Sequence, residues 1–447
     1  MGRMIGHWRG MPGWAMPAAV AAAILFASFA TLAEPPKTEA PDRSRPVVTT
    51  AYRTPLDERG AVLADLGVAR WHQQGWRGQG IKVAILDSGF RGYRAALGTC
   101  LPKRVTAKSF RVDGDLEARD SQHGILCAEV IHALAPDAEL LLANWEPDSP
   151  ESFARAMAWA KSEGARVATC SVIMPSWSDG AGGGPVHASL RATLGDGQSA
   201  RDMMFTASAG NLAQRHWGGT LAPNRHQDHQ WIAGQQLNPI VPWGNERVAV
   251  ELYGSLSCAC QLQVIDRTTG KVVQEAELTP ENVDGRMWGQ TAVRFEPEPR
   301  HDYAVAVRIL GVPSANDHVH LVVLGGHLDH CTQAGSIPFP GDGANVMTFG
   351  CVDERRQRLA YSSCGPNSQR PKPDFVAQVP FPLRFRDQPF TGTSAAAPQG
   401  AALAAILMSR DPGLTPQRIH GALRSAAVDL MQPGHDGETG YGLLRLP

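Results

Sequence analysis

Between residues 76 and 215, short apolar runs alternate with amphipathic stretches. The run at 81–86, Ile-Lys-Val-Ala-Ile-Leu, is almost continuously apolar, which is typical of a strand buried on both faces of a parallel sheet. Further strands are predicted at 138–144, 166–172 and 203–209, and helices at 123–134, 152–163 and 188–194. Strands that alternate with helices predict a doubly wound, mostly parallel α/β sheet.

The pattern changes at about His216, and no convincing helical periodicity follows before about Cys331. Short β-rich runs take its place, at 248–253, 260–266, 291–295, 303–309 and 318–324. We therefore expect a β-sandwich or jelly-roll domain at 216–333, inserted into the α/β domain. The second part of the α/β domain, 334–447, resumes with a buried strand at 346–351 and ends with helices after Ser394 and at 415–426.

The N-terminus has the features of a secretory signal peptide. Arg3 and Arg9 precede an apolar run at 18–29, and small residues lead to Ala33. We predict cleavage after Ala33, followed by a leader or N-terminal extension at 34–75 that is short for a folded inhibitory pro-domain. The protein would then be secreted, or lie in the periplasm or cell envelope. An uncleaved anchor is the alternative, and it is the one route to the membrane that the sequence offers.

Composition narrows the function classes. The 447 residues are 43% hydrophobic and 19% charged, which indicates a globular protein of about two domains. The formal net charge is −1 and no long basic run is present, so nucleic-acid binding has no electrostatic support. We expect a monomer.

Eight cysteines are present, and in an exported protein some are expected to pair. Cys351 and Cys364 flank a short segment and are the first candidate pair. Cys127 and Cys170 have apolar neighbours and are predicted to be free core thiols. No cysteine–histidine spacing matches a zinc site.

Four polar residues stand at predicted element ends. Asp87 ends the first buried strand, His123 opens a helix, Asn211 follows a strand, and Ser394 opens an Ala-rich helix. A serine nucleophile needs a base, which a histidine supplies near neutral pH, and a buried carboxylate orients that histidine. The N–H of Ser394 and the amide of Asn211 would then stabilise an oxyanion.

Each of these residues also has an ordinary interpretation. Ser394 could be a helix N-cap and Asp87 a turn residue. His123 could be one of fifteen unremarkable histidines, and Asn211 could occupy a left-handed turn. Taken together, the four residues favour a catalytic site.

The order Asp, His, Ser and the segments around these residues resemble the subtilisin-like serine protease (subtilase) family. The matching segments are Val-Ala-Ile-Leu-Asp-Ser-Gly at 83–89, His-Gly at 123–124, Ser-Ala-Gly-Asn at 208–211 and Gly-Thr-Ser-Ala-Ala-Ala-Pro at 392–398. The resemblance covers about residues 76–215 and 334–447. It implies an exported serine endopeptidase with an acyl-enzyme intermediate and no cofactor, with Ser171 and Gly210 binding substrate. Structural calcium is frequent in the family, but no compact acidic run places a site here.

The chain departs from the family pattern at some positions. Ile125 stands where the family usually has Thr, Ala395 stands where Met is common, and the segment 170–177 lacks the usual Ser-x-Gly cradle. The sequence therefore does not determine the shapes of the substrate pockets. A catalytically silent binding or adhesion protein, and a transpeptidase or macrocyclase that uses the same acyl-enzyme, remain alternatives.

Two groups in or beside the insertion have competing interpretations. The cluster His327, Asp329 and His330 suggests a metal site, but no further ligand stands at suitable spacing. We therefore predict no metal site there. The aromatic residues of His216-Trp217 and Trp243 are expected to pack at the domain junction.

Overall fold

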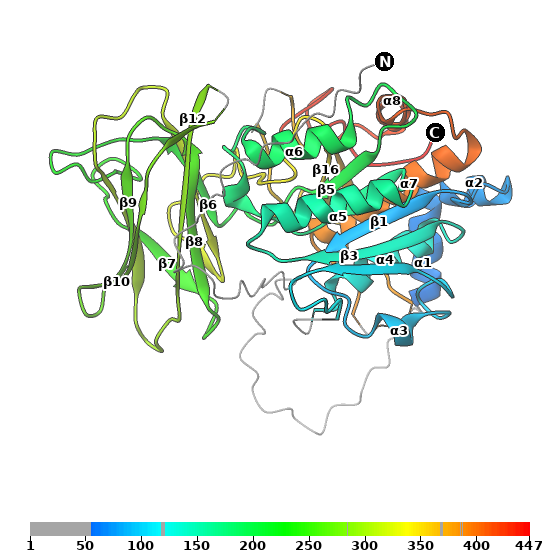
Figure 1. Cartoon of the computed structure of the whole chain (residues 1–447), viewed down its shortest axis with the longest axis horizontal. Coiled ribbons are helices and arrows are strands. Elements are labelled where there is room, and N and C mark those ends of the chain that lie inside the picture. The colour runs from blue at the N-terminus through cyan, green and yellow to red at the C-terminus, as the bar shows by residue number, and fades with distance from the viewer. Residues whose placement is uncertain (1–54, 118–120, 284, 367–369, 385, 387) are drawn as a thin grey trace, which may run out of the picture.

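The computed structural model describes residues 55–117, 121–283, 285–366, 370–384, 386 and 388–447. The predicted signal peptide and residues 34–54 lie outside the described residues. Figure 1 shows an α/β region that begins with α1 and ends with α8, and a β-rich region beside it that is built from the middle of the chain.

Seven strands form the sheet of the α/β region, in the order β17-β16-β5-β4-β1-β3-β2, and every pairing is parallel. Their bounds are β1 Lys82–Asp87, β2 Thr106–Phe110, β3 Glu139–Trp145, β4 Val167–Cys170, β5 Met204–Ser208, β16 Met347–Val352 and β17 Phe375–Gln378. The strand order reverses around β1, which lies between β3 and β4. In open α/β sheets, ligands bind outside the carboxyl ends of the strands at such a reversal.

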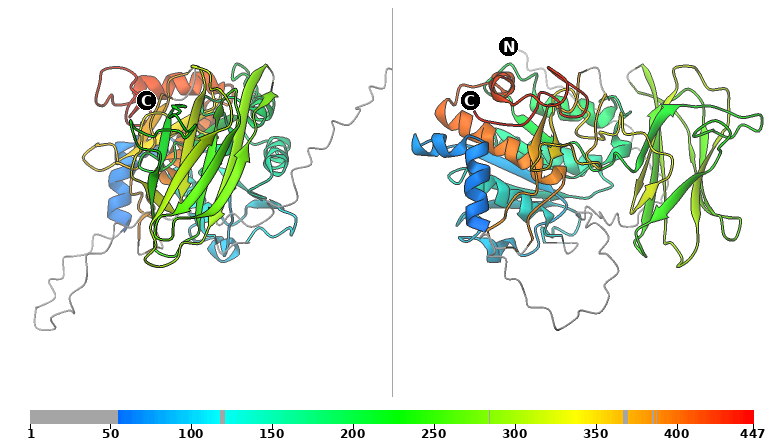
Figure 2. Two further views of the ribbon diagram at one scale, coloured as in Figure 1. Left: turned by 90° about the vertical axis from the view of Figure 1, so that its left-hand side faces the viewer. Right: turned by 180° about the vertical axis from the view of Figure 1, so that it is seen from behind.

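Helices cover both faces of this sheet. Figure 1 shows α5 and α6 on one face, and the view from behind in Figure 2 shows α1 and α7 on the other. The helices are α1 Pro55–Asp65, α2 Val68–Gln73, α3 Tyr93–Ala96, α4 His123–Leu134, α5 Pro150–Ser162, α6 Pro185–Leu194, α7 Thr393–Arg410 and α8 Pro416–Ala426, with a 3₁₀ turn, η2, at Pro175–Trp177. Every residue of α7 from Thr393 to Ser409 is buried. Within the described part of the chain, no helix has the length and apolarity needed to cross a bilayer.

The β-rich region is a sandwich of two five-stranded sheets, in the orders β10-β9-β13-β7-β15 and β11-β12-β8-β14-β6. Its strands are β6 His216–Thr220, β7 Asn238–Pro242, β8 Val248–Ser255, β9 Cys260–Asp266, β10 Lys271–Leu278, β11 Glu281–Val283, β12 Arg286–Phe295, β13 Tyr303–Ile309, β14 His318–Leu324 and β15 Gly326–Leu328. Alternate residues of β9 are buried, as expected for a sheet with one face in a core. The predicted fold class, a parallel α/β sheet with an inserted β-sandwich, is confirmed.

The sandwich contacts the α/β region through its β8–β12–β14 sheet. The buried carboxylate of Glu251 on β8 accepts a hydrogen bond from the backbone N–H of Ser176 at 3.1 Å. The indole N–H of Trp288 on β12 donates to the Ser178 carbonyl at 3.2 Å. Burial raises the pKa of Glu251 above its usual value. The insertion therefore contacts the loop that follows β4 through these two hydrogen bonds.

The expected disulfide between Cys351 and Cys364 is wrong, because both residues are free thiols in the structure. Cys351 is fully buried on β16, whereas the thiol of Cys364 donates to the Gln333 carbonyl at 3.2 Å. The two side chains therefore occupy different environments. Cys127 and Cys170 are buried free thiols, as predicted.

The packing of α7 against the sheet predicts an asymmetric response to two glycine substitutions. A Cβ at Gly400 would lie 2.1 Å from Cζ of Phe349, whereas a Cβ at Gly421 on α8 would meet nothing within 4 Å. We expect Gly400→Ala to lower the free energy of unfolding by about 1–3 kcal/mol through overpacking. The matched Gly421→Ala should raise it by up to about 1 kcal/mol through helix propensity. Chemical denaturation measures both, and equal effects would contradict the packing described.

Candidate active site

Asp87 is the last residue of β1, and its carboxylate has no solvent exposure. The backbone N–H of Ser88 donates to Oδ1 at 2.7 Å, and the Ser88 hydroxyl donates to the same oxygen at 3.2 Å. Nδ1 of His123 lies 2.9 Å from Oδ1 and 2.8 Å from Oδ2. A carboxylate that only accepts hydrogen bonds requires the proton of the neutral imidazole to sit on Nδ1.

His123 is the first residue of α4, and its Nε2 is buried without a hydrogen-bond partner in the described structure. The ring of Phe390 stands edge-on to the imidazole, with the ring centroids 5.6 Å apart. Burial alone would lower the pKa of His123, but the charge of Asp87 and its hydrogen bond together outweigh burial and raise this pKa. The imidazole therefore has its proton-accepting nitrogen free.

Ser394 is the second residue of α7, and 7% of it is exposed. The N-cap of the helix is Gly392, so the interpretation of Ser394 as an N-cap is wrong. The hydroxyl of Ser394 donates to the Ser171 carbonyl at 3.4 Å. Ser394 Oγ thus points to the loop after β4 and not to Nε2 of His123, which has no partner.

Asn211 follows β5, and its side chain is fixed by Thr393. The amide oxygen accepts the Thr393 N–H at 3.1 Å and the Thr393 hydroxyl at 3.0 Å. The amide nitrogen faces Gly392, where an added Cβ would lie 3.0 Å from it. Asn211 has no positive φ, so its interpretation as a left-handed turn residue is wrong. The amide is oriented with its donor end toward the start of α7.

Ser171 and Gly210 lie against the same helix start. The Ser171 hydroxyl donates to the Ser394 carbonyl at 3.1 Å. The Gly210 N–H donates to the Thr393 hydroxyl at 3.1 Å. Gly210 has φ 91°, and a Cβ there would approach the Pro338 ring at 3.1 Å. The structure therefore brings together five of the residues that the sequence singles out: Asp87, His123, Ser171, Gly210 and Asn211, all around Ser394.

Sequence reasoning missed the roles of Ser121, Cys127 and Thr393 in this arrangement. The hydroxyls of Ser88 and Ser121 lie 2.9 Å apart, and the His123 N–H donates to Ser121 Oγ at 3.4 Å. The Cys127 thiol contacts both Asp87 Oδ2, at 3.7 Å, and the Ser394 carbonyl, at 3.8 Å. Cys127 stands four residues after His123, so helical spacing alone could have placed it on the same face.

Ligand atoms of Asp87, His123 and Cys127 all lie within 4.8 Å of one another. A thiol and an imidazole do not suit calcium, which takes oxygen ligands. In addition, the carboxylate and Nδ1 already bind each other. Among the described residues, no other group of this kind occurs, so the residues His327, Asp329 and His330 do not form one.

Part of the chain matches a known protein family. The family model described as the subtilase family matches residues 296–442. Over that stretch, about a third of its length, the chain is similar to the subtilase family. The matched stretch contains Ser394 and lies C-terminal to Asp87, His123 and Asn211, which the fold brings to the same place as the serine.

Curated relatives match over short stretches. Minor extracellular protease Epr of Bacillus subtilis is 28% identical over 109 residues, which are 24% of this chain and 17% of the relative. Alkaline elastase YaB of a Bacillus species is 30% identical over 111 residues, 25% of this chain and 28% of the relative. Subtilisin DY of Bacillus licheniformis is 26% identical over 126 residues, 28% of this chain and 44% of the relative. The chain thus covers less than half the length of each of these relatives.

Among solved structures, the CspB protease of Clostridium perfringens is similar over 85% of this chain and 95% of its own, with a TM-score of 0.60 and 14% sequence identity. At that identity the likeness shows the fold. Because it covers most of both chains, the likeness is not confined to the segments that carry the subtilase motifs.

The contact between Asp87 and His123 predicts how the imidazole titrates. In Asp87→Asn, the raising effects of the carboxylate disappear and burial remains, so we expect the pKa of His123 to fall below the usual value of about 6.5. Titration followed by NMR of the His123 ring protons measures the shift. Asp196→Asn, at an exposed loop aspartate, should leave the pKa unchanged. An unchanged His123 pKa in Asp87→Asn would contradict the arrangement.

Proposed function

We propose that this protein is a serine endopeptidase of the subtilase type. Ser394 is the nucleophile, His123 is the general base and then acid, and Asp87 orients His123. The observation that carries the proposal is the buried, unpartnered Nε2 of His123, whose Nδ1 is held by Asp87. An imidazole fixed in this tautomer is ready to accept the proton of a nearby hydroxyl.

The proposed reaction begins when the Ser394 hydroxyl turns from the Ser171 carbonyl toward Nε2. Oγ attacks the carbonyl carbon of the scissile peptide, and its proton passes to Nε2. The imidazolium is stabilised by the carboxylate of Asp87 and then gives the proton to the departing amine, which leaves an acyl-enzyme on Ser394. His123 next takes a proton from water as the water oxygen attacks the ester carbonyl. The imidazolium then returns that proton to Ser394 Oγ as the ester bond breaks, which releases the acid and restores the enzyme.

The oxyanion of the tetrahedral intermediate is proposed to accept hydrogen bonds from the amide nitrogen of Asn211 and the backbone N–H of Ser394. Two features support this assignment. Thr393 holds the amide by its oxygen, which leaves the nitrogen to donate. Ser394 is also in the first turn of an 18-residue helix, where N–H groups have no intrahelical acceptor and the helix dipole favours negative charge.

The proposed substrate is a protein or peptide, and the proposed setting is outside the cytoplasm. The N-terminal sequence supports export, and relatives are described as extracellular proteases. Ser171 and Gly210 lie beside Ser394 on neighbouring loops, and we assign them to the substrate-binding surface. The shape of the pocket beyond them depends on the loop that contains η2, which the insertion holds through Glu251.

Replacement of the nucleophile gives the first test of this function. We expect Ser394→Ala to abolish covalent labelling by a fluorophosphonate probe and to reduce peptide hydrolysis by at least about 10³-fold. Gel detection of the labelled protein measures the first and release of a fluorophore the second. Ser425→Ala, at an exposed serine on α8, should label like the wild type. Equal labelling of Ser394→Ala would show that another residue is the nucleophile.

The oxyanion assignment has its own test. Asn211→Ala removes the proposed donor and should lower kcat by about 10²–10³-fold with little change in KM. Thr393→Val keeps the side-chain shape but loses the hydroxyl that fixes the amide, so a smaller loss of about tenfold in kcat is expected. Steady-state kinetics on a peptide substrate measure both. A change in KM alone would place Asn211 in ground-state binding instead.

A further inference from the structure

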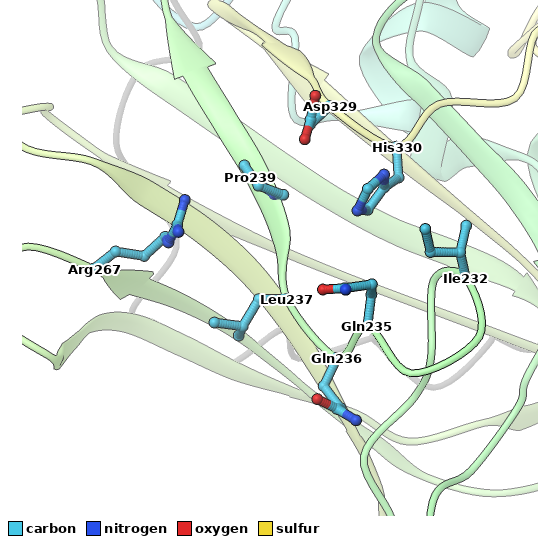
Figure 3. Close-up of a pocket in the computed structure, with 8 residues that line it drawn as sticks. All are labelled: Ile232, Gln235, Gln236, Leu237, Pro239, Arg267, Asp329 and His330. Carbon is cyan, nitrogen blue, oxygen red and sulfur yellow. The ribbon is translucent and has the colours of Figure 1, made fainter.

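The outer sheet of the insertion has a concavity of about 420 Å³ that the proposed mechanism does not use. Its apolar part is formed by Pro239 on β7 and by Ile232 and Leu237 in the preceding loop (Figure 3). Ile232 is 51% exposed and Leu237 36%, and neighbouring Val241 on β7 is 58% exposed. These are three of the eight large apolar side chains that the described residues leave exposed, so exposed apolar surface is concentrated here.

Polar side chains stand around this apolar part. Figure 3 shows Arg267 on one side of β7 and His330 on the other, with Asp329 near them and two glutamines below. In the described part of the chain, none of the side chains of Arg267, Asp329 and His330 makes an ion pair or a hydrogen bond. A guanidinium and a carboxylate that line one concavity without protein partners are available to a ligand.

The backbone around the concavity is held in place although the side-chain ends are free. Asn238 is fully buried, and its amide accepts the His330 N–H at 2.9 Å and donates to the His330 carbonyl at 2.7 Å. The Asp329 N–H donates to the Pro239 carbonyl at 3.0 Å. Fixed walls reduce the entropy that binding would cost.

A row of neighbouring residues leads from the candidate active site to β7, on which the concavity lies. Arg215 donates from Nε to the Asn211 carbonyl at 3.0 Å, and its guanidinium lies 4.7 Å from the ring centre of Trp243. The rings of Trp243 and His327 are 5.2 Å apart, and His327 pairs across the strands with Val241. Val241 lies on the same face of β7 as Pro239, since side chains two residues apart share a face.

We propose that the concavity is an exosite for the polypeptide substrate, which binds a segment of the chain several residues away from the scissile bond. The inference rests on the proposed endopeptidase function. Trp243 to Pro239 spans about 13 Å of strand, which about four extended residues cover. Because Arg215 adds further length, a bound substrate needs more than about four extended residues between the two sites. The segment that fits has an apolar residue for Ile232 and Leu237 beside an acidic residue for Arg267.

Two substrates with the same scissile sequence test the exosite. The short one carries four residues on each side of the bond, and the long one adds twelve residues on each side that include Leu-Glu pairs. We expect Arg267→Glu to raise KM for the long substrate about tenfold or more, while kcat and all kinetics on the short substrate stay unchanged. For a long substrate with Lys in place of Glu, the KM of the Arg267→Glu variant should return toward the wild-type value for the original long substrate. Lys271→Glu, an exposed residue on β10 of the same sheet, is the matched control.

The outcomes distinguish a failure of the exosite proposal from a failure of the proposed peptidase function. If Arg267→Glu has wild-type KM and kcat for both substrates, the exosite is overturned and the peptidase function stands. If the wild type cleaves neither substrate, the proposed peptidase function fails, and the exosite is decided by binding. Fluorescence anisotropy of the labelled long peptide then compares Ser394→Ala with the double variant Ser394→Ala/Arg267→Glu. Weaker binding to the double variant supports the exosite, and equal or absent binding overturns it. Retention on an immobilised oligosaccharide that Arg267→Glu loses, with peptide kinetics unchanged, would assign the concavity to a glycan and overturn the proposal.

Discussion

The buried contact between Asp87 and His123 is the constraint on which the rest of the site depends. A carboxylate without solvent is costly unless hydrogen bonds satisfy it, and here Ser88 and the imidazole Nδ1 do so. The same hydrogen bond that stabilises the buried charge fixes the imidazole tautomer and leaves Nε2 as the basic atom. The Asp87–His123 hydrogen bond therefore both stabilises the buried carboxylate and leaves Nε2 able to accept a proton. The ring of Phe390 lies beside the imidazole and adds apolar surroundings.

This contact can form only if β1, α4 and α7 approach closely. Asp87 ends the strand at which the sheet order reverses, where the carboxyl ends leave space between neighbouring loops. The start of α7 reaches that space because the helix presents small residues to the sheet, and Gly400 lies directly on Phe349. The alanines at 395–397 are also fully buried, so larger side chains there would overpack the start of the helix.

Sequence alone predicted the elements that have a strong apolar signature. The strand β1 and the helix α4 were found because β1 is buried on both faces and most residues of α4 are apolar. Strands such as β10, with an almost fully exposed pattern, and β6, which contains two adjacent glycines, have no such signature and were missed. The residues that meet at the candidate site were singled out by type and position. The hydrogen bonds of Thr393 to Asn211 depend on a tertiary approach that no local pattern encodes.

The insertion cannot be a removable module in this structure. Leu212, one residue after Asn211, packs in one buried cluster with Tyr253 and Val322 of the sandwich. Ile173 of the loop after β4 packs against this cluster. Removing the sandwich would expose that cluster and leave the Ser176 N–H without the Glu251 carboxylate. Both losses fall on loops that adjoin Ser394, because Ser171 and Asn211 begin them. The sandwich therefore supports the geometry of the candidate site through contacts, whatever ligand its outer sheet binds.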